Sequence, residues 1–248
     1  MFKFLKRLQK LFLRNYRAKK LGIQFKRSSK FILPDSISWN GERTQLLAPD
    51  ENGVKMAFID IFFDDCYGLK YLPKSTAKVL DIRAHIGFFS LASRIAFPNA
   101  VIHSYEPNPR LQNYLKHQAE IGRFDYFMEA VGKENGKVSL EYHPDSVQTR
   151  SRVDVEGKIP AIAFRKVIQR LGGNVDLVKL DCEGAEWLLF EDAEPWQAVQ
   201  NVSMEYHLWP NHTHNEIKCV LENLGFSIEK QKRIARDYGL IIASRIKR

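Results

Sequence analysis

From Lys78 onward, short apolar segments alternate with amphipathic ones, and this alternation constrains the fold more than any other feature of the chain. KVLDI, AVIHSYEP and VDLVKLDCEG are predicted strands; IGFFSLASRIAF, NPRLQNYLKHQAEIG and AEWLLFEDAEPW are predicted helices. Strands that are apolar on both faces and separated by helices are typical of a mostly parallel sheet covered on both sides. The sequence therefore predicts an α/β fold with about seven strands and a terminal antiparallel hairpin, FSIEKQKRI and YGLIIASRI.

The remaining patterns divide the chain into three predicted parts. Residues 1–22 form a helical arm, residues 23–77 a small β-extension or cap, and residues 78–248 the main domain. Within the cap, KMAFIDIFF is predicted to be a strand. Within the main domain, DYFMEAVG is a predicted strand, GKVSLEYH an extra β-excursion and residues 145–158 a polar loop.

The net charge of +9 is concentrated in one place. Residues 1–34 hold eleven Lys and Arg and no acid, so the rest of the chain, with 27 basic against 29 acidic residues, is nearly neutral. A nucleic-acid enzyme would more often spread basic surface around its active site, which argues against a nucleic-acid partner. The three cysteines lie far apart in unlike contexts, which favours a reducing compartment and hence the cytoplasm.

Residues 1–20 have the pattern of a basic amphipathic helix. Phe4, Leu8, Leu11, Phe12 and Tyr16 recur at helical intervals, and cations fill most other positions. One hypothesis is peripheral contact with anionic lipid. The alternative is a helix whose apolar face packs on the body or on another subunit, and contact with nucleic acid is a third hypothesis.

Acids stand at the end of each predicted strand, where ligands bind in open α/β sheets. Glu106 follows Asp81 by 25 positions, at the end of the second strand, where a carboxylate can accept ribose hydroxyls. The first turn lacks G-x-G-x-x-G and retains only Gly87, so nothing there would cradle a pyrophosphate. This combination favours a nucleoside cofactor without phosphates, such as S-adenosylmethionine.

Four stretches resemble the FkbM-type S-adenosylmethionine-dependent methyltransferases: VLDIRAHIGFFSLASRIAFPNAVIHSYEPNPRLQNYL, EAVG, VDLVKLDCEGAEWLLF and MEYH. The resemblance covers about residue 60 to the end. It implies the class I methyltransferase fold, with a seven-stranded Rossmann-like sheet, and methyl transfer to oxygen. It further implies that the cofactor is bound by Asp81, Arg83, Ala84, Gly87, Glu106, Asn108, Glu129 and Ala130, and it puts Asp181, Glu183 and Glu186 in an acidic motif.

Arg83 departs from the family pattern, which has glycine at this position. Glycine serves where backbone approaches a ligand closely or takes a positive φ. Three hypotheses follow: Arg83 blocks the pocket, points outward, or folds over the cofactor carboxylate as a charge partner. The neighbouring His85 is predicted to be a solvent-facing or capping residue.

A hydroxyl acceptor with a high pKa needs a base or a metal ion. Asp181, Glu205 and His207 should face one cleft from adjacent strands, with His207 as a candidate base. Asp181 and Glu205 also offer hard oxygen ligands for Mg²⁺, and His212 and His214 would join His207 in a less specific cluster.

The predicted function is O-methylation of a sugar, glycan or small-molecule hydroxyl. The alternatives are an RNA methyltransferase and a non-catalytic protein with a decayed cofactor turn. The latter rests on Arg83.

Overall fold

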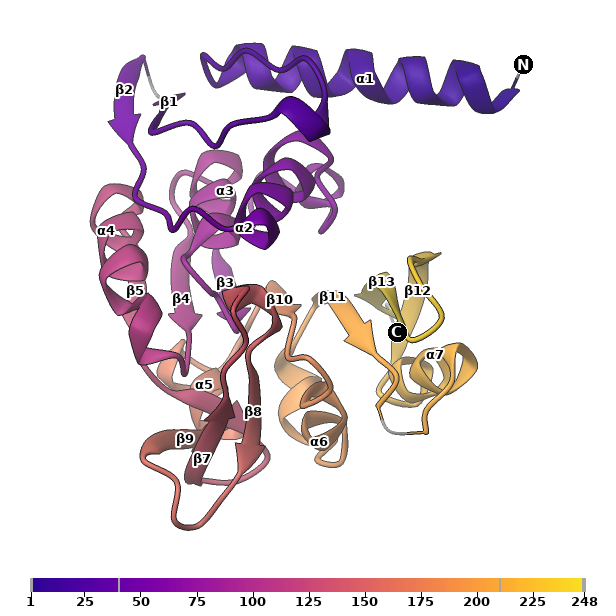
Figure 1. The fold of residues 1–248 in the computed structure, drawn as a ribbon. Coiled ribbons are helices and arrows are strands. Elements are labelled where there is room, and N and C mark those ends of the chain that lie inside the picture. The colour runs from indigo at the N-terminus through magenta and orange to yellow at the C-terminus, as the bar shows by residue number, and fades with distance from the viewer. Residues whose placement is uncertain (1, 40, 210, 247–248) are drawn as a thin grey trace.

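A computed structural model describes residues 2–39, 41–209 and 211–246, and its centre is a seven-stranded sheet (Figure 1). The strand order is β12-β13-β11-β10-β3-β4-β5. The strands are β3 (Lys78–Ile82), β4 (Val101–Tyr105), β5 (Asp125–Phe127), β10 (Leu177–Leu180), β11 (Asn201–His207), β12 (Phe226–Arg233) and β13 (Tyr238–Arg245).

The pairing confirms the predicted class I methyltransferase architecture. Strands β5, β4, β3, β10 and β11 are parallel, and β13 runs antiparallel to both β11 and β12. The terminal hairpin is therefore present, with β13 inserted between β11 and β12. The chain moves outward in opposite directions from β3 and β10, so the strand order reverses between them, and ligands bind at the carboxyl ends beside such a reversal.

Helices cover both faces of the sheet. Val79 packs with residues of α3 and α4, whereas its neighbour Leu80 packs with residues of α5, α6 and α7. This alternation follows from the opposite directions of successive side chains in a strand. The helices are α3 (Phe88–Ala96), α4 (Gln112–Gly122), α5 (Phe164–Arg170), α6 (Glu186–Phe190) and α7 (His214–Asn223).

A second sheet of four strands, in the order β6-β9-β7-β8, interrupts the main domain. Its strands are β6 (Ala130–Gly132), β7 (Gly136–Glu141), β8 (Arg150–Val153) and β9 (Ile159–Ala163). The predicted β-excursion is confirmed as β7. Two predictions were wrong: residues 145–158 contain β8, and DYFMEAVG is divided between β5 and β6, which belong to different sheets.

The N-terminal part contains α1 (Phe2–Lys20), the hairpin β1 (Ser36–Trp39) and β2 (Glu42–Gln45), and α2 (Asn52–Phe58). The predicted strand KMAFIDIFF is wrong, because α2 continues as a π-helical turn, Ile59–Phe63. Short apolar runs do not distinguish a strand from a buried helix by periodicity alone. The side chains buried here, Val54, Phe58, Ile59 and Phe63, follow helical spacing. No helix in the described ranges is long and apolar enough to cross a membrane.

Candidate active site

The turn after β3 has an unusual backbone. Arg83 and His85 both adopt a positive φ, of 61° and 55°, and Gly87 follows with 86°. A Cβ atom at Gly87 would lie 2.9 Å from Leu115 Cδ1 and 3.1 Å from Phe124 Cζ. Glycine is therefore required at position 87 both by conformation and by space.

The Arg83 side chain does not point into solvent, and hydrogen bonds to neighbouring segments hold it in place. Its guanidinium donates hydrogen bonds to the carbonyl oxygens of Asp181 (2.9 Å), Val147 (3.0 Å) and Thr149. Nη1 also lies 3.5 Å from Glu183 Oε1. Arg83 thus connects the first turn to the end of β10 and to the 146–149 segment. A guanidinium suits this role because its N–H donors have a fixed planar geometry.

His85 and Glu106 hold the turn from two sides. The His85 ring nitrogen Nε2 lies 2.8 Å from Ser146 Oγ, so the side chain connects the first turn to the 146–149 segment. The prediction of a solvent-facing or capping role was wrong. Burial, aided by the Arg83 charge, lowers the pKa of His85 to about 3. The buried Glu106 carboxylate accepts backbone N–H bonds from His85 and Asn108, both at 2.8 Å, and burial raises its pKa.

Asp81 lies beneath the turn and is completely buried. It accepts a hydrogen bond from Ser90 Oγ (2.6 Å), and its other oxygen lies 3.2 Å from Lys179 Nζ. Lys179 also donates to the Arg83 carbonyl oxygen at 2.7 Å. Burial alone would lower the pKa of Lys179, but the charges of Asp81 and Asp181 raise it. The pair therefore fixes the backbone of the turn.

Glu129 and Ala130 lie beyond the third strand. Glu129 forms an ion pair with Arg170 at 2.7 Å, and Arg170 also donates to the Tyr105 hydroxyl. Ala130 is buried at the start of β6. The Arg170 guanidinium, which is paired with Glu129, also lies over the aromatic ring of Phe127 at 4.3 Å from the centroid.

A cavity of about 930 Å³ opens at the carboxyl ends of β3, β10 and β11. Of the predicted cofactor residues, Arg83 and Ala84 line it, and all three predicted catalytic residues do so too. In the described part of the chain, the other predicted cofactor residues do not border this cavity: Asp81, Gly87, Glu106, Asn108, Glu129 and Ala130.

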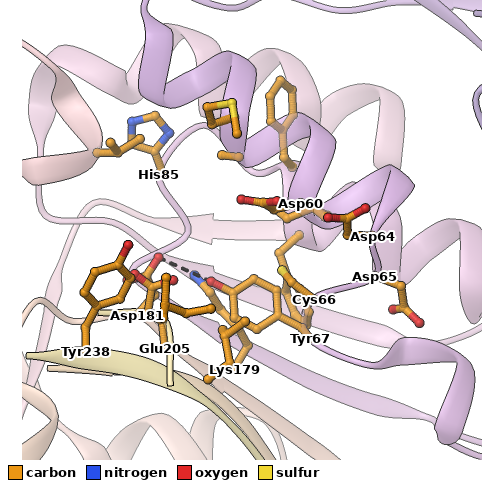
Figure 2. A pocket seen from close by; sticks show the side chains of 18 of the residues that line it. Asp60, Asp64, Asp65, Cys66, Tyr67, His85, Lys179, Asp181, Glu205 and Tyr238 are labelled. Atoms are coloured by element: carbon orange, nitrogen blue, oxygen red, sulfur yellow. Dashed lines mark hydrogen bonds between the residues drawn. The ribbon is translucent and has the colours of Figure 1, made fainter. Parts of the chain in front are cut away.

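The predicted catalytic residues form one cluster, as expected. His207 Nε2 lies 3.6 Å from Glu205 Oε1 and 3.6 Å from Glu183 Oε2, while Nδ1 lies 3.5 Å from the fully buried Glu186 Oε1. Asp181 accepts a hydrogen bond from the Tyr67 hydroxyl at 3.3 Å (Figure 2). The cluster thus holds one imidazole among four carboxylates.

Burial and the charges in this cluster shift the pKa values of its side chains. Burial alone would lower the pKa of His207, but the neighbouring Glu186 carboxylate raises it to about 9. Burial and the Asp181 charge raise the pKa of Glu205 to about 8. Burial would also raise the pKa of Asp181, but Lys179 and Arg83 hold it below its usual value. Near neutral pH, His207 is therefore cationic and Asp181 anionic.

Another wall of the cavity comes from the segment whose first part, up to Phe63, was predicted to be a strand. Figure 2 shows Asp60, Asp64, Asp65, Cys66 and Tyr67 on this segment, with the Tyr67 hydroxyl next to Asp181. The run DIFFDDCYG was the available signal, because three aspartates in an otherwise apolar segment need a polar environment. Burial raises the pKa of the Cys66 thiol well above its usual value, so this cysteine is not an activated nucleophile.

Several smaller predictions can be compared with the structure. Cys182 is buried, and Gly184 has a φ of 100° and packs closely against the Trp209 ring. The predicted histidine cluster is wrong: His212 stacks on Trp187, and His214 bonds the Tyr206 hydroxyl. Among described residues, the donor atoms that come within 4.8 Å of one another and suit a metal ion belong to Asp181, Glu205 and His207.

Comparison with known proteins agrees with this geometry. The family model of the methyltransferase FkbM domain matches residues 81–228, which is more than half of the chain. The chain belongs to the FkbM methyltransferase family. The matched FkbM domain begins at Asp81 and includes the Arg83–Gly87 turn, Glu106, the acidic motif at 181–186, and both Glu205 and His207.

Two fungal methyltransferases are similar over most of their length. Methyltransferase sdnD of Sordaria araneosa is 26% identical over 233 residues, covering 77% of this chain and 89% of the relative. Methyltransferase 1 of Beauveria bassiana is 23% identical over 203 residues, covering 70% and 81%. Both similarities extend well beyond the 148 residues of the FkbM match, into the N-terminal part or the last strands.

Solved structures of two methyltransferases are among the matches to this chain. Magnesium protoporphyrin IX methyltransferase from Synechocystis PCC 6803, with bound SAM, gives a TM-score of 0.48 at 11% identity and covers 81% of this chain and 86% of its own. Precorrin-6y C5,15-methyltransferase from Geobacter metallireducens gives 0.45 at 14% identity, covering 74% and 87%.

Proposed function

We propose that this FkbM protein transfers a methyl group from S-adenosylmethionine to a hydroxyl of a sugar, a glycan or another small molecule. The observation that carries the proposal is the single cavity that joins the first turn to Asp181, Glu205 and His207. A turn that can hold a cofactor and a group that can take a proton thus share one space.

The residues of the cavity suit this cofactor. S-adenosylmethionine supplies an electrophilic methyl group on a positively charged sulfur, and the carboxylate of Asp181 in the cavity complements that charge. Ala84 and His85 bring the backbone of the turn to the same cavity. Glu106 is buried outside this cavity and uses two of about four acceptor sites for backbone N–H groups, so ribose hydroxyls would reach its remaining acceptor sites only if the turn opened.

Glu205 is the better candidate for the general base. The role that the sequence suggested for His207 fits poorly, because an imidazole with a pKa of about 9 already carries its proton at neutral pH. With a pKa of about 8, Glu205 is only about one-tenth ionised at pH 7, but it loses its proton at a lower pH than His207 and is therefore the first of the two to become available as a base. When the acceptor oxygen forms its bond to the methyl carbon, the carbon–sulfur bond would break, its electron pair would stay on the sulfur of the demethylated product, and the acceptor's proton would pass to ionised Glu205, which lies beside cationic His207.

Two alternatives are less well supported. Beyond residue 34 the chain has 27 basic against 29 acidic residues, and this near-neutral balance disfavours an RNA substrate. The non-catalytic hypothesis rests on Arg83, yet its guanidinium is bonded to three backbone carbonyls at the edge of the turn. The free cysteines remain compatible with a cytoplasmic enzyme.

Calorimetric titration with S-adenosylmethionine and its demethylated product tests the proposal. We expect micromolar binding to the wild type, at least tenfold weaker binding to Glu106→Gln, and unchanged binding to Glu205→Gln. Product release with a panel of hydroxyl compounds should then fall about 10²-fold or more in Glu205→Gln. A folded wild type that binds neither compound would refute the proposal.

A further inference from the structure

Helix α1 is attached to the body by its cationic face. Arg14 forms a two-pronged ion pair with Asp64, at 2.6 and 2.7 Å, and Lys10 contacts the same carboxylate at 2.7 Å. Arg17 donates to the Phe63 carbonyl at 2.8 Å, and Ala18 is fully buried one position further on. These residues lie three or four positions apart, so they define one side of the helix.

The apolar side of α1 consequently faces away from the body. Phe4 is 64% exposed and Phe12 72% exposed, and Leu8 and Tyr16 between and after them are about half exposed. At 100° per residue these side chains lie nearly opposite Lys10, Arg14 and Arg17. The hypothesis that the apolar face packs on the body was therefore wrong, and Figure 1 shows α1 extending along the outside of the molecule.

A contiguous apolar face of this size marks an interaction surface. Its basic flanks indicate the partner: Arg7, Lys19 and Lys20 are exposed beside it, and residues 1–34 contain no acid. A second copy of the chain would bring two equally basic helices together, which like-charge repulsion opposes. Nucleic acid would bind the cations without using the apolar face. An anionic lipid surface uses both features.

The cavity described above opens beside this helix. Gln9, Lys10, Leu13 and Arg17 of α1 border the cavity. At 100° per residue Gln9 lies about 60° and Leu13 about 100° from Phe12 around the helix, so the cavity begins at the edge of the apolar face. Exposed cations from other elements, Lys70, Lys230 and Lys232, border it as well. The mouth is thus basic at its rim, although the interior is acidic.

We propose that α1 binds an anionic lipid surface through its outward apolar face and thereby holds the cavity mouth at that surface. The acceptor would then be an amphiphile that presents its hydroxyl headgroup at the membrane. The lipid contact stands on α1 alone, whereas the class of acceptor rests on the proposed function.

Flotation with vesicles tests the lipid contact. We expect the full chain to float with phosphatidylcholine vesicles containing phosphatidylglycerol, and at least tenfold less with pure phosphatidylcholine. The double variant Leu8→Gln and Phe12→Gln should lose flotation at least tenfold. The matched control, Val153→Gln and Val155→Gln, removes two exposed apolar side chains, 68% and 82% exposed, in and after β8 and should float normally.

Three results would overturn the proposal. Absence of flotation in the wild type would exclude a lipid partner. Self-association in sedimentation that disappears in the Leu8→Gln and Phe12→Gln variant would assign the face to a second copy. Salt-dependent RNA binding that persists in that variant, without flotation, would assign the helix to nucleic acid. Unchanged calorimetric binding of S-adenosylmethionine would show in each case that the proposed function is unaffected.

Hydrogen exchange tests the position of the cavity mouth. Anionic vesicles should slow amide exchange at least threefold in α1 and in the rim at residues 232–238, and leave α5 unchanged. Protection of α1 without protection of the rim would refute a membrane-facing mouth and leave the lipid contact standing.

Discussion

The buried carboxylate of Glu186 lies 3.5 Å from Nδ1 of His207 and also accepts the backbone N–H of His207 at 2.6 Å. Its other oxygen accepts the N–H of Gly184 at 2.8 Å, so Glu186 is fixed in place. It determines the orientation and charge of His207 from outside the cavity. The aspartate and glutamates of the acidic motif therefore divide their roles, with Asp181 in the cavity and Glu186 behind it.

This relationship predicts how stability depends on pH. The pKa of His207 rises on folding from an ordinary 6.5 to about 9, so its contribution is complete below about pH 6.5 and disappears as the pH rises through 9. The pKa of Glu205 rises from 4.5 to about 8, and its contribution is likewise lost with rising pH. Between pH 6 and 9 the His207 shift spans about 2.5 pH units and the Glu205 shift about 2, so unfolding in urea should show a loss of about 6 kcal/mol.

Glu186→Gln should flatten this dependence, because the neutral amide no longer raises the pKa of His207. The variant also loses an acceptor for a backbone N–H, which lowers its stability by a similar amount at every pH. The quantity to compare is therefore the slope of unfolding free energy against pH. Glu222→Gln, which alters an exposed pair with Lys218, should keep the wild-type slope. An unchanged slope in Glu186→Gln would contradict the assignment.

Arg83 and Arg123 both adopt a positive φ, so a substitution at Arg123 serves as the control for one at Arg83. Arg83→Ala should cost about 3 kcal/mol, because Glu183 and three carbonyl oxygens lose their partner. Arg123→Gly should be neutral or stabilise by up to about 1 kcal/mol, since Arg123 ends α4 in a conformation that glycine prefers. An Arg83→Ala protein of normal stability that binds S-adenosylmethionine more tightly would show that Arg83 obstructs the turn.

Substitutions at Gly87 and Gly41 distinguish the cost of a steric clash from the cost of a positive φ. Gly87→Ala should cost about 2–4 kcal/mol, because a Cβ would meet Leu115 and Phe124 in addition to the unfavourable φ. Gly41→Ala has a similar φ of 82° and nothing within 4 Å, so it should cost about 1 kcal/mol. Thermal or urea unfolding measures both, and equal losses would mean that packing at the turn is loose.

Divalent metal should not be needed for turnover. A divalent cation at His207 would have to displace a proton held with a pKa of about 9, so this site should bind metal weakly near pH 7. Turnover after dialysis against EDTA should therefore match that with added Mg²⁺. A tenfold stimulation by Mg²⁺ that is absent in Asp181→Asn would instead support the magnesium site considered from the sequence.

The sequence by itself determined the sheet and the positions of its acids. Alternating apolar patterns give strands and helices, and strand ends in a parallel sheet share one edge, so Asp181, Glu205 and His207 were brought together as predicted. The basic amphipathic helix at residues 2–20 could also be predicted from the sequence, because its apolar side chains recur with a period of about 3.6 residues.

Only the tertiary structure decided how these local features are used. The contacts of Arg83 with Val147 and Thr149, and of Arg14 with Asp64, join residues 50 or more positions apart, and no spacing rule predicts such pairs. The same holds for the helix formed by KMAFIDIFF, which the surrounding apolar core selects over a strand. Burial and long-range charge therefore set which face α1 exposes and which carboxylate can accept a proton.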